Sequence, residues 1–240
     1  MIETKNLTKK FDSFTAVDSL EIRIETGEFF GLLGPNGAGK TTTISLLSTL
    51  LLPTEGEILI DGQTLGRNRP DLKRKISVIT QEYSMRQDMN MDEIMEYQGR
   101  LYFMPRKEIK RKTEELLDFC GLLPFRKRTV RKLSGGMKRK LMVCRALLTS
   151  PEILLLDEPT AGMDALSRRQ MWNLLRQLNG KNLTILLTTH YMEEAQSLCN
   201  RVALMDHGKL EEINTPSGLI DGLGKYTVDQ ETPEAVSYTH

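Results

Sequence analysis

Apolar runs and turn residues alternate along the first 62 residues of the chain. Runs at 2–7, 20–24 and 56–60 have the length of strands, and the dipeptide Asp61-Gly62 ends the third run with a turn signal. This alternation predicts an antiparallel sheet in the N-terminal part of the chain.

Two later apolar runs, at 153–156 and 183–187, are continuous. Such a run is typical of a strand whose two faces are both covered, as in a parallel sheet between helices. Residues 202–205 and 209–213 flank the turn Asp206-His207-Gly208 and predict a hairpin at the far edge of that sheet. From residue 71 to about residue 150 the pattern is helical.

A glycine-rich loop of the form G-x-x-x-x-G-K-[ST] follows the apolar run at 29–33. Its glycines reach backbone angles closed to other residues, so consecutive N–H groups can converge on one anion. Lys40 adds a cation, and Thr41 adds a hydroxyl suited to Mg²⁺, at the positive end of the helix expected to begin there. The loop predicts nucleotide binding by Gly34, Pro35, Asn36, Gly37, Ala38, Gly39, Lys40, Thr41 and Thr42.

Polar residues follow two of the predicted buried strands, on the side of an open α/β sheet where ligands bind. Asp157 is placed to hold Mg²⁺ directly or through water, and Glu158 to orient and deprotonate a water that attacks the γ-phosphate. His190 follows the other strand. Ser134 is a predicted N-cap of a helix that starts with two glycines, which indicates a second anion site.

Composition excludes some classes of protein. The 33 basic and 32 acidic residues nearly cancel, so overall charge does not indicate a nucleic-acid partner. We find no signal-peptide pattern and no apolar segment near the ~20 residues of a membrane span, and we expect a cytoplasmic protein. Cys120, Cys144 and Cys199 form no C-x-x-C pair, and we interpret them as core residues in a reducing compartment.

Two local features each have two interpretations. Residues 106–140 hold thirteen basic and four acidic residues, which indicates a solvated helical face or proximity to anionic lipid headgroups. Five of the 12 methionines lie between residues 85 and 104, where they fill a core or form a groove for a partner helix. We favour the groove because this stretch follows Gln81.

The order of these motifs resembles the nucleotide-binding domain of an ABC transporter over essentially the whole chain. The resemblance rests on the phosphate loop, Gln81, Leu-Ser-Gly-Gly at 133–136, Leu-Leu-Leu-Asp-Glu at 154–158, Ala-Gly-Met-Asp at 161–164 and His190. It implies a P-loop α/β fold with a mostly parallel core sheet, an antiparallel β-subdomain and a helical signature subdomain. We expect one domain at 1–225, with the helical subdomain at about 82–150, and a tail at 226–240.

The resemblance also implies roles for single residues. Gln81 senses Mg²⁺ and the attacking water, His190 contacts the γ-phosphate, and Asp164 belongs to a loop that communicates between two domains. An aromatic residue stacks on adenine, and Phe11 falls at its position with Phe14 as a rival. Val17 is a further ATP-binding candidate. The signature residues, which contact ATP on a second domain, are Leu133, Ser134, Gly135, Gly136 and Met137.

Two copies, or this chain and a paralogous ATPase, are therefore expected to enclose two ATP molecules and to drive separate polytopic subunits from the cytoplasmic face of the membrane. Met137 replaces the glutamine common at the fifth signature position. With the run at 188–195, this resembles the export branch of daunorubicin-resistance ATPase subunits. An importer ATPase and a soluble ABC ATPase outside transport are the alternatives. Residues 82–132 leave no room for the long coiled coil of a chromosome-maintenance ATPase.

Overall fold

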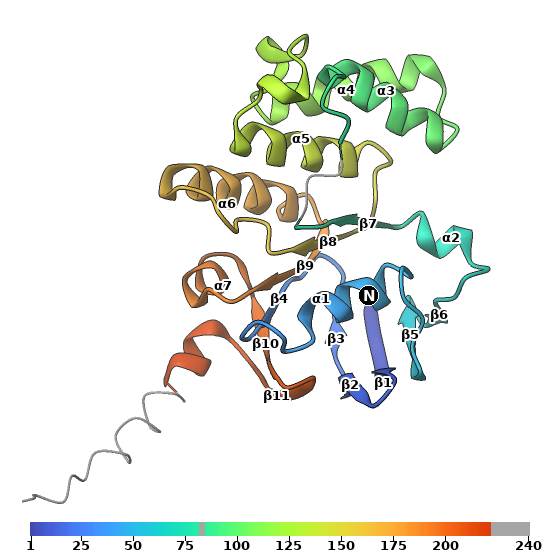
Figure 1. Ribbon diagram of the computed structural model, residues 1–240, viewed down its shortest axis with the longest axis vertical. Helices are drawn as coiled ribbons and strands as arrows, with labels where there is room; N and C mark the ends of the chain where they lie inside the picture. Colours follow the sequence, from blue (N-terminus) through green and yellow to red (C-terminus); the bar gives the residue numbers. More distant parts are fainter. Residues whose placement is uncertain (82–84, 222–240) are drawn as a thin grey trace, which may run out of the picture.

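The computed structural model describes residues 1–81 and 85–221, which form two sheets flanked by helices (Figure 1). The larger sheet has the strand order β11-β10-β4-β9-β8-β7 in this part of the chain. Adjacent strands in this sheet are parallel, except for β10 and β11, which pair antiparallel and form the predicted edge hairpin. The strands are β4 (Phe29–Leu33), β7 (Ile76–Ile79), β8 (Ile153–Asp157), β9 (Thr184–Thr189), β10 (Arg201–Asp206) and β11 (Lys209–Asn214).

The central strands of this sheet face two different cores. In β4, Phe29 and Leu33 pack into a core that contains residues of helices α5 and α6, whereas Phe30 and Leu32 pack into a second core with the N-terminal strands. Every residue of β4 is buried. Because side chains alternate between the faces of a strand, a continuous apolar run is what two cores require. The predicted parallel sheet is confirmed.

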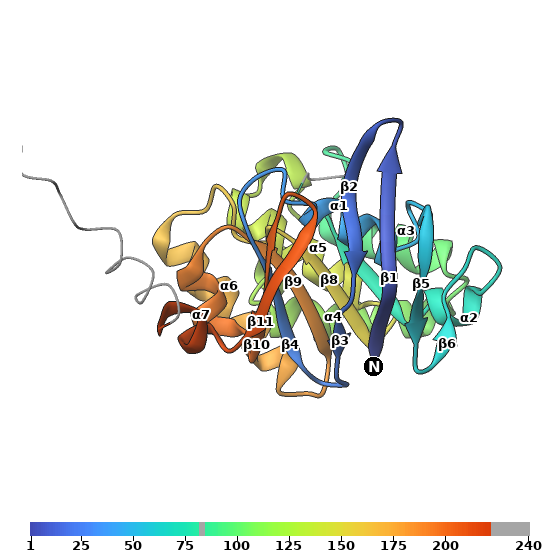
Figure 2. The same cartoon turned by 90° about the horizontal axis from the view of Figure 1, so that it is seen from below.

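The smaller sheet is antiparallel and has the order β2-β1-β5-β6, with β3 also paired to β1. It consists of β1 (Ile2–Phe11), β2 (Phe14–Leu20), β3 (Arg23–Ile24), β5 (Glu55–Ile60) and β6 (Gln63–Thr64). Seen from below in Figure 2, the hairpin of β1 and β2 lies beside the hairpin of β10 and β11, and the N–H of Asp18 donates to the carbonyl of Gly208 at 2.8 Å. The predicted antiparallel sheet is confirmed.

The single strand predicted at 20–24 is wrong, because the chain divides there between β2 and β3. The buried hydroxyl of Thr4 donates to the carbonyl of Leu20 at 2.8 Å and accepts from the N–H of Ile22 at 3.0 Å. A side chain therefore takes the place of a backbone partner at this point. A local side-chain bond of this kind competes with a regular ladder.

Along the chain, helices separate the strands of the core sheet from β4 to β10. They are α1 (Lys40–Leu47), α2 (Pro70–Lys73), α3 (Met91–Leu101), α4 (Arg106–Phe119), α5 (Gly135–Leu147), α6 (Ala165–Asn179) and α7 (Met192–Leu198). In Figure 1, α3, α4 and α5 gather at the end of the molecule opposite the antiparallel sheet. The helical pattern predicted from residue 71 to about residue 150 is wrong at 76–79, where β7 forms a strand of four residues parallel to β8.

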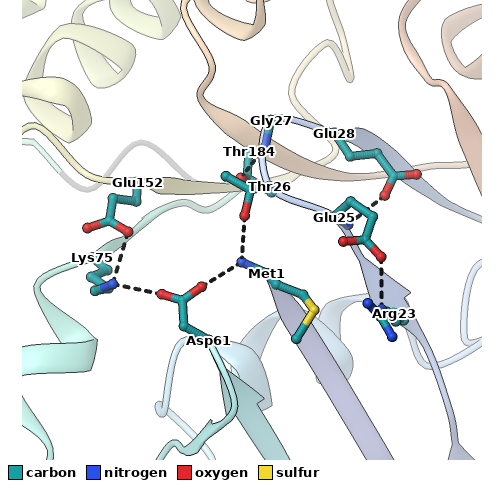
Figure 3. A network of polar contacts seen from close by, with 10 residues as sticks. All are labelled: Met1, Arg23, Glu25, Thr26, Gly27, Glu28, Asp61, Lys75, Glu152 and Thr184. Atoms are coloured by element: carbon teal, nitrogen blue, oxygen red, sulfur yellow. Dashed lines mark hydrogen bonds and ion pairs between the residues drawn. The ribbon is translucent and has the colours of Figure 1, made fainter.

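A polar network joins the two sheets at the ends of the parallel strands opposite the phosphate loop (Figure 3). Lys75, just before β7, pairs with Asp61 of the small sheet at 2.7 Å and with Glu152, just before β8, at 3.0 Å. The Asp61 carboxylate also accepts from the terminal ammonium group of Met1 at 2.8 Å. The lysine thus connects two core strands to the turn after β5.

The methionines between residues 85 and 104 fill the core, so the interpretation as a docking groove is wrong. Met85, Met91 and Met95 are buried, and Met89 and Met104 pack against the same hydrophobic core. Methionine suits an irregular space between helices because its side chain is unbranched and flexible. A surface for a partner helix has to be built from other residues.

Several residues of the basic segment form ion pairs at the surface. Arg111 pairs with Glu115 at 2.8 Å, Lys112 with Glu108 at 3.2 Å, and Arg126 with Asp92 at 2.8 Å. These contacts agree with a solvated face. Arg139 is different, since only 2% of its surface is exposed. The cysteines are free and buried, as predicted: Cys120, Cys144 and Cys199. The predicted tail at 226–240 lies outside the described residues.

Candidate active site

The phosphate loop joins β4 to α1, and two of its glycines have positions that no other residue can take. A Cβ atom on Gly34 would lie 2.2 Å from the carbonyl oxygen of Met205, and one on Gly39 would lie 2.5 Å from that of Ala16. Gly39 is also the N-cap of α1, with a φ of 95°. The loop therefore packs closely between the β1–β2 hairpin and the β10–β11 hairpin. The N-terminus of α1 is directed at the ligand of this loop.

The ammonium group of Lys40 lies inside this loop. It donates to the carbonyl oxygens of Gly34 and Pro35 at 2.7 and 2.8 Å, and the residue is only 5% exposed. Burial lowers the pKa of Lys40 below its ordinary value, although the carboxylates of Glu158 and Asp157 act in the opposite direction. A buried cation at the start of a helix suits an anionic ligand with several oxygens.

The carboxylate of Asp157 lies beside the first turn of α1. Its Oδ1 atom accepts from the hydroxyl of Thr41 at 3.1 Å and from the hydroxyl of Thr188 at 2.6 Å. Thr188 lies on the neighbouring strand β9, and both Asp157 and Thr188 are buried. Carboxylate and hydroxyl oxygens are ligands that Mg²⁺ accepts.

Glu158 follows directly and has a left-handed backbone, with a φ of 46°. Its N–H donates to the Thr188 hydroxyl at 3.0 Å. The Oε1 atom of Glu158 lies 3.1 Å from Nδ1 of His190. The structure thus brings together the two residues that sequence alone placed at the ends of two separate strands.

A cavity of about 360 Å³ covers the phosphate loop. Its lining includes the carboxylate of Glu158, the amide of Gln81, and Phe14 and Ala16 of β2. The loop and helix residues that line it are Asn36, Gly37, Gly39, Lys40, Thr41 and Thr42. Several ATP-binding candidates and the metal candidates Thr41 and Gln81 therefore share one space. Asp157 does not line it but accepts a hydrogen bond from Thr41, which does.

The aromatic candidate that lines the cavity is Phe14. Phe11 is its partner in the register of β1 and β2 and lies under the ammonium group of Lys9, 5.0 Å from the ring centroid. Phe14 is 62% exposed beside the phosphate loop, whereas Val17 is wholly buried in the core. The structure therefore favours the rival residue over Phe11 for stacking on a base, and gives Val17 a packing role.

The signature segment lies outside this cavity, since none of its residues lines it. The Ser134 hydroxyl caps α5 and accepts from the N–H of Met137 at 3.3 Å, as the sequence predicted. Leu133 is buried, while Ser134 and Gly135 are exposed and Gly136 is half-buried. Asp164 caps α6 by accepting from the N–H of Ser167 at 2.9 Å, and hydrogen bonds from Ser167 lower the pKa of this carboxyl.

Two residues of the site carried no sequence signal that we used. Thr188 bonds to both acidic residues, and Arg139 donates from α5 to the carbonyl of Glu158 at 3.2 Å. Thr188 directly follows the apolar run at 183–187, and Arg139 lies in the basic segment interpreted as a solvated face or a surface near anionic lipid. The run Thr-Thr-His at 188–190 was the available signal, because the first of these threonines faces the end of β8.

The sheet order, the phosphate loop and the acid pair at the end of β8 define a P-loop ATPase. The sequence profile of the ABC transporter family matches residues 17–161. The Nod factor export ATP-binding protein I of Cupriavidus metallidurans is 37% identical over 221 residues, which cover 92% of this chain and 73% of that protein. The daunorubicin/doxorubicin resistance ATP-binding protein of Streptomyces peucetius is 38% identical over 223 residues, which cover 93% of this chain and 68% of that protein.

Solved structures agree with this assignment. A dimeric ATP-binding cassette in a post-hydrolysis state, bound to ADP and Pi, has a TM-score of 0.79 at 28% identity, covering 90% of this chain and 99% of its own. The chain belongs to the ABC transporter family and is the ATP-binding, ATP-hydrolysing subunit of an ABC transporter. The predicted family and fold are confirmed. The described residues include no helix long and apolar enough to cross a membrane.

Proposed function

We propose that this chain is the ATPase subunit of an exporter and hydrolyses ATP between two copies of itself. The observation that carries the proposal is the division of the motifs. The cavity contains the phosphate loop, Gln81 and Glu158, whereas the exposed start of α5 with Ser134 lies outside it. A second chain, related by a two-fold axis, can bring its own Ser134 to the open side of each cavity.

Within one cavity, the residues divide the work on ATP. Lys40 exchanges its two loop carbonyls for phosphate oxygens, and the N–H groups of the loop and of the first turn of α1 bind the same phosphates. Phe14 stacks on the adenine. The second copy contributes the residues of its signature segment, and Asp164 stands near that junction as the cap of α6.

The donor set beside the phosphate loop fits Mg²⁺. The Thr41 hydroxyl and the Asp157 carboxylate are 3.1 Å apart, and the amide-bearing Gln81 lines the same cavity. These are oxygen donors, which magnesium prefers. When bound, the ion neutralises charge on the phosphates.

Glu158 and His190 act in the hydrolysis step. Glu158 accepts a proton from the attacking water, and His190, 3.1 Å from its Oε1 atom, orients the carboxylate and contacts the γ-phosphate. Loss of the γ-phosphate removes the bridge between the two copies and lets them separate.

The exposed C-terminal part of α3 is the proposed contact with a polytopic membrane subunit on the cytoplasmic face. Tyr97, Leu101, Tyr102 and Phe103 are 43% to 90% exposed there. A groove of about 310 Å³ runs between this part of α3 and the end of α1, lined by residues that include Thr49, Gln98 and Tyr102. The groove lining is mostly polar, and the exposed aromatic and aliphatic side chains lie on and just after the same part of α3. Polar and apolar surface together suit an amphipathic helix.

The experiment is a pull-down of the tagged chain from gently solubilised membranes of its own cell, with co-purifying proteins identified by mass spectrometry. A polytopic protein in stoichiometric amount, lost in the variant Tyr102→Asp, supports the proposal. Export is then measured as ATP-dependent loss of a compound from cells. Accumulation of a compound inside cells indicates an importer, and ribosomal or DNA-associated proteins without a membrane partner indicate a function outside transport.

A further inference from the structure

Arg139 is a fully enclosed cation in the signature helix. It lies on α5 (Gly135–Leu147), is 2% exposed, and stands four residues after the helix begins. Its Nη1 atom donates to the carbonyls of Thr80 and Gln81 at 2.9 and 3.3 Å. Its Nη2 atom donates to the carbonyl of Glu158 at 3.2 Å. One guanidinium group therefore contacts the backbone of both Gln81 and Glu158, two residues that line the cavity.

The backbone at Glu158 is a costly conformation for any residue with a Cβ atom. Its φ of 46° lies in the left-handed region, and such a residue persists only where its surroundings impose it. Two contacts do so here: the Glu158 N–H donates to Thr188 at 3.0 Å, and its carbonyl accepts from Arg139. The peptide groups before and after Glu158 are thus each held by one hydrogen bond.

We propose that Arg139 is a positioning residue, which links the signature helix to the Gln81 loop and to Glu158 within one chain. Movement of α5, as when its first turn engages ATP on a second copy, then displaces both polar residues of the cavity together. This inference rests on the proposed role of Glu158 as the base. Arg139 acts through the backbone of these residues and does not touch ATP itself.

An arginine suits this position better than other residues. Its planar group offers several N–H donors in a fixed geometry, so it can satisfy carbonyls on two different segments at once. Lysine has a single ammonium group, and glutamine has a short amide that is neutral. The next residue of α5, Lys140, is half-buried, and its Nζ atom lies 3.4 Å from Oε1 of Gln170. This contact does not involve the carbonyls that Arg139 binds.

The test measures steady-state ATP hydrolysis by the full chain and its variants Arg139→Gln, Arg139→Lys and Lys140→Gln. Misplacement of a catalytic group by about 1 Å costs up to 10²-fold in rate. We expect Arg139→Gln to lower kcat at least tenfold with KM for ATP within about threefold of wild type, and Arg139→Lys to recover part of the loss. Lys140→Gln keeps the wild-type kcat.

Two further measurements separate positioning from loss of structure. The thermal midpoint and the number of ATP sites per chain are determined for each variant, and a structural defect lowers both. If Arg139→Gln does not fold, Arg139→Lys alone decides. A folded variant with full ATP binding and a kcat within about twofold of wild type overturns the inference.

Glu158→Gln is assayed in parallel to keep two failures apart. Turnover in Glu158→Gln contradicts the proposed function itself. Loss of turnover in Glu158→Gln combined with normal turnover in Arg139→Gln contradicts only the inference about Arg139.

Discussion

Nδ1 of His190 lies 3.1 Å from Oε1 of Glu158, although the two residues are 32 positions apart and follow different strands of the core sheet. Adjacent parallel strands β8 and β9 bring their carboxyl ends together, so the pair is a direct result of sheet order. The contact holds the carboxylate that we assign as the base toward the phosphate loop.

Replacing His190 is therefore expected to affect the chemical step more than binding. We predict that His190→Ala lowers kcat at least tenfold and changes the affinity for ATP by less than about threefold. Steady-state hydrolysis and a binding titration on the same preparation measure the two quantities. His207→Ala is the control, because His207 is 95% exposed in the hairpin of β10 and β11. Equal losses in the two variants would contradict the role of His190.

Lys40→Ala is predicted to weaken nucleotide binding. The ammonium group is buried among the loop carbonyls and is the cation nearest the phosphates in the proposed complex. A titration with a fluorescent ATP analogue measures the dissociation constant, which we expect to rise at least tenfold. Lys209→Ala, at an exposed side chain on β11, is the matched control. Unchanged affinity in Lys40→Ala refutes the assignment of the loop.

Phe14 and Phe11 allow a matched test of base stacking. They face each other in the register of β1 and β2, but only Phe14 lines the cavity. Stacking of an aromatic side chain on a base contributes about 1–3 kcal/mol. We predict that Phe14→Ala raises the dissociation constant for ATP about tenfold, whereas Phe11→Ala changes it less than about twofold. The opposite order of effects would return the role to Phe11.

Asp92 ties the start of α3 to the loop before the signature segment. Burial alone would raise the pKa of the Asp92 carboxyl, but hydrogen bonds from Arg126 and Lys127 outweigh it and hold the pKa below its ordinary value. A carboxyl whose pKa is lower in the folded state stabilises the fold above the pKa of the unfolded chain, about 3.9, and this contribution is lost as the pH falls through the folded pKa.

We therefore predict that Asp92→Asn lowers the free energy of unfolding by about 1 kcal/mol between pH 5 and 8, and that the difference from wild type shrinks below about pH 4. Denaturant unfolding at several pH values measures it. Asp118→Asn, at an exposed position on α4, serves as the control. A difference that grows as the pH falls has the wrong sign for this account.

Elements with local chemistry could be predicted from the sequence. The phosphate loop, the Ser134 cap and the buried run that becomes β8 each depend on residues that are close in the chain. β7 could not be predicted because a strand of four residues, three of them half-buried, is too short to show a period. The division between β2 and β3 depends on the side chain of Thr4, which comes from another strand.

The site shows the same limit. Asp157, Glu158 and His190 were predicted because each ends an apolar run, but their mutual distances depend on strand order. Arg139 lay in the basic segment interpreted as a solvated face or a surface near anionic lipid, and both interpretations place it at the surface. The interpretation of the methionines between residues 85 and 104 as a groove was wrong for a related reason. A flexible side chain suits both a core and a binding surface, and only packing distinguishes the two.

The mass of Glu158→Gln in solution, measured by light scattering with and without saturating ATP and Mg²⁺, shows whether a second copy completes each site. We predict a monomer without nucleotide and a dimer with ATP, because turnover stops while both halves of each site remain. Adding the change Ser134→Arg to the signature is expected to abolish the dimer. A Glu158→Gln protein that stays monomeric with ATP bound would contradict the completion of each site by a second copy.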